Sequence, residues 1–176
     1  RQRSRGPGRM PRMRALPTYD EAVVLPSGSR LTVPADYGDL NGHLNVRNYV
    51  AIYDDAEWEI FGGMGIGAEE AAAGIGGVFA LEQCLTYRRE VLVGEEVSSH
   101  VRVVARRGAL LHAVSYLLNH TRREVASSME ALEGWVSFES RRLTPFPDRA
   151  GRALDALAAE VAGLPWQPAL SGSIRV

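Results

Sequence analysis

The stretch Asp39-Leu-Asn-Gly-His-Leu-Asn-Val-Arg-Asn-Tyr49 decides the fold, because a polar loop runs here directly into a helical pattern. From Tyr49 onward apolar side chains recur every three or four residues, the spacing of one buried face on an α-helix. This face comprises Tyr49, Ile52, Tyr53, Ala56 and Ile60. We expect Asn45 or Asn48 to cap the helix, and Gly62-Gly63 to end it. Four acids are expected on its solvent side: Asp54, Asp55, Glu57 and Glu59.

Long β-rich stretches follow the helix, separated by breaks of a few residues. Breaks this short predict antiparallel neighbours. The predicted strands cover residues 78–91, 96–105, 109–120 and 125–141. Further predicted elements are short strands at 21–25 and 30–33, a helical turn at 68–73 and a terminal helix at 149–162. One long central helix wrapped by a curved antiparallel sheet is an α+β fold.

The length of 176 residues suits a single core. We divide the chain into a disordered arginine-rich arm (1–17), a main domain (18–147) and a C-terminal helix and tail (148–176). The arm carries six arginines and no acid in its first fourteen residues, and Met10 or Met13 could be the natural start. A tether to nucleic acid or a membrane is the alternative for such an arm.

The body of the chain has an acidic balance, which argues against nucleic acid as a partner. No apolar run approaches the roughly 20 residues of a membrane span, so we expect no membrane partner. Cys84 is the single cysteine and cannot form an internal disulfide, which suits a cytoplasmic protein. His100, His112 and His120 share no metal-ligand spacing and are interpreted as structural; no metal site is expected.

The loop before the helix combines the two groups that acyl transfer needs. Asp39 supplies a carboxylate, which can attack an acyl carbon or activate a water. Free backbone N–H groups at the helix start can hold the carbonyl oxygen as negative charge develops on it. A thioester is reactive enough for a carboxylate to act without a serine triad. A turn or capping role for Asp39 is the alternative.

Three stretches carry a resemblance to a known family: residues 39–45, Leu85-Thr-Tyr-Arg-Arg-Glu-Val91 and Arg142-Leu-Thr-Pro-Phe-Pro147. With the long helix behind the first of them, the chain resembles hotdog-fold thioesterases of the 4-hydroxybenzoyl-CoA type. It looks closest to the branch that includes betainyl-CoA thioesterases. The resemblance covers residues from about 20 to 147 and implies the hotdog fold.

The resemblance also implies the roles of individual residues. The family's catalytic aspartate falls on Asp39, and the amide that polarises the thioester carbonyl falls on or near Val46. Val46 stands where many relatives carry a second asparagine, so water positioning by that side chain is not expected. The predicted substrate-binding residues are Gly42, His43, Asn45, Val46, Asn48 and Tyr49.

Several of these positions have a second interpretation. Asp36 is a rival carboxylate whose spacing from Gly42 does not match. His43 could position substrate or tune Asp39, or it could bond the backbone; Asn45 could contact substrate or only cap the helix. Another hotdog subclass places its catalytic carboxylate on the central helix, which would make Glu57 or Glu59 the candidate. A box for a quaternary ammonium group could be formed by four aromatics: Tyr37, Tyr53, Trp58 and Trp135.

The sequence thus predicts an acyl-CoA thioesterase. No metal or redox cofactor is expected, and coenzyme A enters only as part of the substrate. The family works as dimers or dimers of dimers with the site between subunits, so the resemblance implies a homo-oligomer. The alternatives are a hotdog protein that binds acyl-CoA without turnover, and an enoyl-thioester hydratase or dehydratase.

Overall fold

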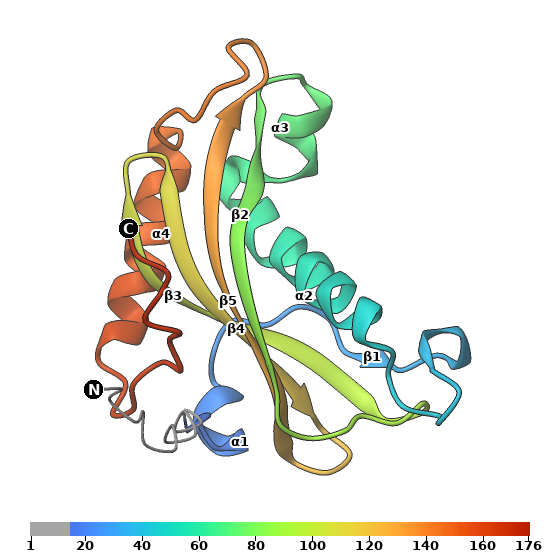
Figure 1. Ribbon diagram of the computed structural model, residues 1–176. Coiled ribbons are helices and arrows are strands. Elements are labelled where there is room, and N and C mark those ends of the chain that lie inside the picture. Colours follow the sequence, from blue (N-terminus) through green and yellow to red (C-terminus); the bar gives the residue numbers. More distant parts are fainter. Residues whose placement is uncertain (1–14) are drawn as a thin grey trace, which may run out of the picture.

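A curled five-stranded antiparallel sheet holds one long helix on its concave side (Figure 1). The structure is a computed structural model that describes residues 15–176. Its strand order is β1-β3-β4-β5-β2, with all neighbours antiparallel. The strands are β1 (Leu31–Thr32), β2 (Gly76–Tyr87), β3 (Glu96–Arg107), β4 (Leu110–Asn119) and β5 (Glu124–Ser137). This arrangement confirms the predicted α+β hotdog fold.

The central helix α2 (Val46–Phe61) buries the predicted face. Tyr49, Ile52, Tyr53 and Ala56 are all buried, and Tyr53 Oη lies 2.7 Å from Ser127 Oγ on β5. The prediction that Glu57 faces solvent is wrong. Glu57 lies four residues after Tyr53, so it falls on the same side of the helix and is buried.

The α-helix α2 ends at Phe61 with Gly62 as its C-cap, as predicted, and a different turn follows it directly. Residues Gly62–Ile66 form a wider π-type turn, in which Gly65 has φ +83°. Such a positive φ is cheap only for glycine, so Gly65 lets the chain turn into the short helix α3 (Ala68–Ala72). The helical turn predicted at 68–73 is therefore confirmed. Strand β2 then runs back along the helix to form one edge of the sheet.

Three predictions about strands are wrong. The strand predicted at 78–91 runs from Gly76 to Tyr87, so it ends four residues earlier. Residues 21–25 do not form a strand: a short helix α1 (Tyr19–Ala22) starts at Thr18, whose hydroxyl accepts a hydrogen bond from the Glu21 N–H in a capping box. The last strand ends at Ser137 and not at Arg141, because Arg141 adopts φ +57° in a turn closed by its N–H bond to the Ser137 carbonyl.

The outer face of the sheet is covered by the C-terminal helix α4 (Asp148–Ala162), which packs against β3 (Figure 1). Ala150, Leu154 and Leu157 of α4 join Val101 and Val103 in one apolar cluster. The guanidinium of Arg102 donates to the Val161 and Trp166 carbonyls and stacks 4.3 Å from the Trp166 ring centre. The sheet therefore has helices on both faces.

The predicted arm lies mostly outside the described residues. Leu16, near the end of the arm, packs against the apolar cluster around Tyr116 and Trp166. Among the described residues, no helix is both long enough and apolar enough to span a membrane.

Candidate active site

The loop before α2 folds into a tight hairpin-like turn. Asp39 N–H donates to the His43 carbonyl at 2.8 Å, and Gly42 N–H donates to the Asp39 carbonyl at 3.1 Å. Gly42 has φ +78°, which favours glycine at this position. Gly42 therefore shapes the turn.

Backbone donors surround the Asp39 carboxylate. Its Oδ1 accepts from Asn41 N–H at 2.7 Å and from His43 N–H at 3.1 Å. The hydrogen bond from Asn41 is the chief cause that lowers the pKa of Asp39 below the usual 3.8. Asp39 therefore holds the turn, as the structural alternative expects, and its partly exposed carboxylate stays ionised at neutral pH. The catalytic role stays a prediction.

At the start of α2, one described backbone N–H group has no hydrogen-bond acceptor. Asn45 is the N-cap, as predicted: its Oδ1 accepts from Arg47 N–H at 3.2 Å, and its carbonyl accepts from Asn48 N–H at 2.9 Å. Within the part of the chain that the structure describes, the Val46 N–H donates to no other group. It can therefore bind an oxygen that carries negative charge.

Asp39 and Val46 line the same open groove, which has a volume of about 500 Å³. Five of the predicted site residues line it: Asp39, His43, Asn45, Val46 and Tyr49. The other two do not line it. Gly42 shapes the loop, and Asn48 Nδ2 donates to the Tyr37 carbonyl at 3.0 Å, which ties the start of the helix to the preceding turn.

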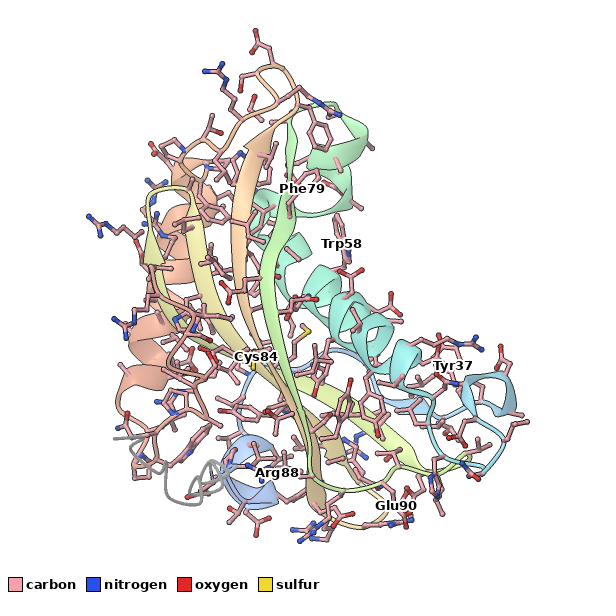
Figure 2. All side chains as sticks on the ribbon, viewed as in Figure 1. Tyr37, Trp58, Phe79, Cys84, Arg88 and Glu90 are labelled. Carbon is pink, nitrogen blue, oxygen red and sulfur yellow. The ribbon has the colours of Figure 1, made fainter. Side chains whose placement is uncertain are left out.

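The other wall of the groove was not predicted as part of the site. It consists of Tyr87 at the end of β2 and the three residues after it, Arg88, Arg89 and Glu90. Figure 2 shows Arg88 and Glu90 beyond the lower end of β2. The available signal was the family resemblance, which already singled out residues 85–91, although the sequence placed Arg88 and Arg89 inside a predicted strand.

Contacts across the groove fix its two walls. His43 Nε2 lies 3.2 Å from Glu90 Oε2, and the Tyr49 and Tyr87 rings meet edge to face at 5.0 Å. Arg89 forms a longer ion pair with Glu124, at 3.4 Å. Burial raises the pKa of Tyr49 to about 12, so this phenol stays neutral and serves as an apolar wall.

Other residues considered from the sequence lie elsewhere. Asp36 is exposed in the 3-10 turn Ala35–Tyr37 and does not line the groove. His100 and His120 join Ser98 in a hydrogen-bonded chain, and His112 Nε2 lies 2.9 Å from Glu130 Oε1, which fits their structural interpretation. The four-aromatic box is wrong. Tyr53 and Trp135 are buried in different apolar clusters, and Trp58 lines a separate pocket.

The comparison with known families bears on this geometry. The family model described as "thioesterase-like superfamily" matches residues 33–154, which contain the loop, α2 and the whole sheet except β1. The chain belongs to the thioesterase-like superfamily. The matched range ends at Leu154, inside α4.

Solved structures support the same fold. One is a hypothetical protein of Staphylococcus aureus in complex with CoA, with a TM-score of 0.77, 21% identity and coverage of 86% of this chain and 95% of that one. A second is a thioesterase of Thermus thermophilus complexed with coenzyme A and zinc (TM-score 0.65, 21% identity, coverage 77% and 96%). A third is a 1,4-dihydroxy-2-naphthoyl-CoA thioesterase of Synechocystis (TM-score 0.66, 8% identity, coverage 73% and 95%). Among curated proteins, no sequence matches.

Proposed function

We propose that this chain hydrolyses acyl-CoA thioesters in the groove at the start of α2. The observation that carries the proposal is the position of Asp39 and Val46, which line the same groove. Asp39 brings an ionised carboxylate and Val46 brings an uncommitted N–H at the positive end of a helix. A nucleophile or base beside an oxyanion donor is what acyl transfer requires.

Two routes use these groups. As a general base, Asp39 takes a proton from a water, whose oxygen adds to the thioester carbon. As a nucleophile, its carboxylate oxygen adds to that carbon and forms an anhydride that water then hydrolyses. In both routes the carbonyl oxygen becomes negative near Val46 N–H, the C–S bond breaks, and the thiolate leaves and takes up a proton.

The second wall of the groove fits coenzyme A. Arg88 and Arg89 carry positive charge where the phosphates of the coenzyme could bind. The S. aureus and T. thermophilus proteins of this fold were solved with coenzyme A, which supports the same ligand here. Coenzyme A is then part of the substrate, and the reaction uses no metal or other cofactor.

We propose further that two copies of the chain share the groove. Strand β2 is an edge of the sheet, and Phe79 and Leu81 on it are 46% and 47% exposed. A long edge strand with exposed apolar side chains favours pairing with a second strand. A dimer, or a dimer of dimers, would bury this edge and close the open side of the groove. The half-buried lone Cys84 suits a reducing compartment such as the cytoplasm.

The release of free thiol from a panel of acyl-CoAs tests the function. The panel contains short, aromatic and cationic acyl groups, since the 4-hydroxybenzoyl-CoA and betainyl-CoA resemblances favour the last two. Thiol release with turnover above the buffer rate is expected for at least one class. Hydration of an enoyl-CoA without thiol release would make the protein a hydratase. Stoichiometric acyl-CoA binding without turnover would make it a binding protein.

A further inference from the structure

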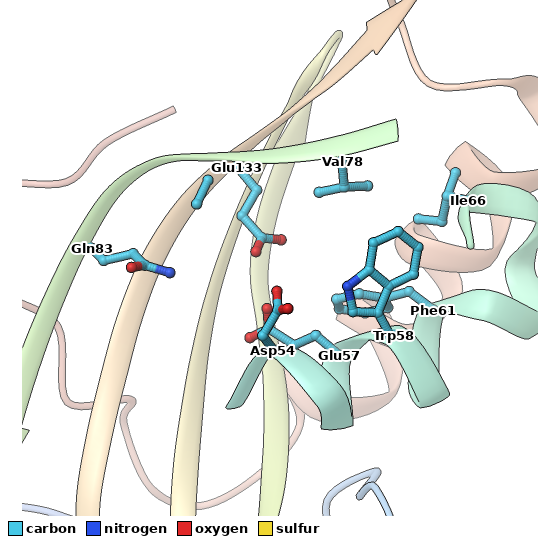
Figure 3. A pocket seen from close by; sticks show the side chains of 9 residues that line it. Asp54, Glu57, Trp58, Phe61, Ile66, Val78, Gln83 and Glu133 are labelled. Carbon is cyan, nitrogen blue, oxygen red and sulfur yellow. The ribbon is translucent and has the colours of Figure 1, made fainter. Parts of the chain in front are cut away.

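A second pocket lies between the C-terminal half of α2 and strand β2, apart from the groove of Asp39 (Figure 3). Its cavity of about 50 Å³ has room for a group of a few heavy atoms. Asp54, Glu57 and Trp58 of α2 form one wall, and Glu133 of β5 and Gln83 of β2 form the other. Figure 3 shows the carboxylates of Asp54 and Glu133 pointing toward each other.

The acids of this pocket are unusually placed. Glu57 and Glu133 are buried, with 7% and 5% of their surface exposed. Glu57 Oε1 accepts from Ser115 Oγ at 2.7 Å, whereas the buried Glu133 Oε2 has no hydrogen-bond donor among the described residues. Burial raises the pKa of both groups, and the charge of Glu57 raises that of Glu133 further. Without a ligand, one proton held between the two carboxyls limits the cost of burying them.

The side chains that line the pocket offer no positive charge. None of them is an arginine or a histidine, and the chain contains no lysine. Among the described residues, no group of His, Cys, Asp and Glu side chains is arranged to hold a metal ion. A buried acceptor without a donor costs free energy, so the pocket favours a ligand that carries both positive charge and N–H groups. The Trp58 ring on the wall adds a face that attracts cations.

We propose that this pocket binds a protonated amine, whose N–H groups donate to Glu133 and Glu57 while its charge faces the Trp58 ring. The ammonium group replaces the proton shared by the two carboxyls, so the net charge of the pocket is unchanged when the amine binds. A quaternary ammonium would satisfy the charge but not Glu133 Oε2, because it has no N–H. The small cavity also favours the smaller head group.

The proposal predicts a pH dependence. The charged groups at the pocket are Asp54 and Glu57 on α2 and Glu133 on β5. The polar side chains that face them are Ser115 on β4 and Gln83 on β2. At low pH the carboxyls hold protons that an amine must displace. Amine affinity therefore rises with pH until the amine itself loses its proton, near pH 10 for an alkylamine such as the lysine side chain.

Isothermal titration calorimetry with n-butylamine tests the proposal on the full chain. Binding is expected, with 1-butanol not binding and butyltrimethylammonium binding about 10-fold or more weakly. Glu133→Gln and Glu57→Gln should each weaken butylamine binding by about 10–100-fold, the range for a hydrogen bond to a charged group. Asp55→Asn is the matched control, because Asp55 is an exposed acid on the same helix that does not line the pocket, and it should bind as the wild type does.

Two results would overturn the proposal: no butylamine binding, or equal loss of affinity in Asp55→Asn and Glu133→Gln. Tighter binding of the quaternary ion would overturn the role of Glu133 Oε2. Inhibition of acyl-CoA hydrolysis by butylamine shows whether the amine that this pocket binds is part of the substrate or a separate molecule. Competition with an acyl-CoA substrate assigns the pocket to a cationic acyl group, and binding without inhibition assigns it to a separate amine. Because the titration needs no turnover, a failure of the proposed hydrolysis would leave it interpretable.

Discussion

At the scale of single residues, Asp39 has two roles: its carboxylate stabilises a turn and is also the candidate catalytic group. The N–H groups of Asn41 and His43 that fix its carboxylate also lower its pKa. An aspartate with a depressed pKa is ionised above that value and becomes protonated only as the pH falls through it. The ionised form is the one that both proposed routes need.

The pH dependence of kcat/KM follows from the lowered pKa of Asp39. We expect the rate to remain level as the pH falls toward 3.8, the usual aspartate value, and to decline only below it. Initial rates between pH 3 and 7, with circular dichroism to confirm the fold at each pH, give the profile. A half-loss of activity near pH 6 in folded protein would assign catalysis to another group.

The cap of α2 gives a second prediction at this scale. Asn45→Ala removes the acceptor of the Arg47 N–H. The loss should cost about 1 kcal/mol of stability, which lowers the Tm by about 2–4 °C in a chain of this length. Thermal unfolding followed by circular dichroism measures it. An unchanged Tm would show that this side chain does not hold the start of the helix.

At the scale of elements, the contact between α2 and the sheet contains an electrostatic cost. The buried Glu57 of α2 meets the buried Glu133 of β5, and burial raises the pKa of both. For a carboxyl whose folded-state pKa is raised, the stability contribution is present at low pH and is lost as the pH rises through the folded pKa. The contact between α2 and the sheet is therefore least stable at high pH, where Glu57 and Glu133 must both ionise.

Glu133→Gln tests this cost, because glutamine keeps the shape and cannot ionise. Relative to the wild type we expect its Tm to be about 2–4 °C higher at pH 8, which corresponds to about 1 kcal/mol, with a smaller difference at pH 5. Scanning calorimetry at both pH values measures the gap. A gap of equal size at pH 5 and pH 8 would contradict the raised pKa of Glu133.

The elements also show how far sequence patterns reach. The long strands were predictable because short breaks fix antiparallel neighbours, and α2 because its apolar spacing persists over three turns. Residues 21–25 were assigned to a strand by their apolar content, although Thr18 and Glu21 form a capping box that outweighs it. Glu57 was assigned to solvent by its charge, whereas its spacing from Tyr49 and Tyr53 places it inside.

At the scale of the whole molecule, α4 closes the outer face of the sheet. Leu154 is fully buried against the β3 side of that face. Leu154→Ala should destabilise the protein by about 2–5 kcal/mol, because it leaves a cavity in the apolar cluster. Urea unfolding measures the loss, with the exposed Val24→Ala as control. Equal effects of the two variants would mean that α4 is not packed as described.

The candidate site could be predicted only in part, for a reason that belongs to the whole fold. Asp39, Asn45 and Val46 lie in one continuous segment, so local patterns reveal them. Arg88 and Arg89 reach the same groove only because β2 returns along the sheet from the far end of α2. Only the family resemblance singled out residues 85–91, and nothing in their local pattern places them beside Asp39.

The most direct test of the account is the kcat of Asp39→Asn on the best acyl-CoA substrate. The asparagine oxygen can still accept from Asn41 and His43 N–H, so the turn should persist and the Tm should stay close to that of the wild type. We predict that kcat falls at least ~100-fold, or ~3 kcal/mol, while Asp36→Asn, outside the groove, keeps wild-type activity. Equal thiol release by folded Asp39→Asn and wild type would contradict the account.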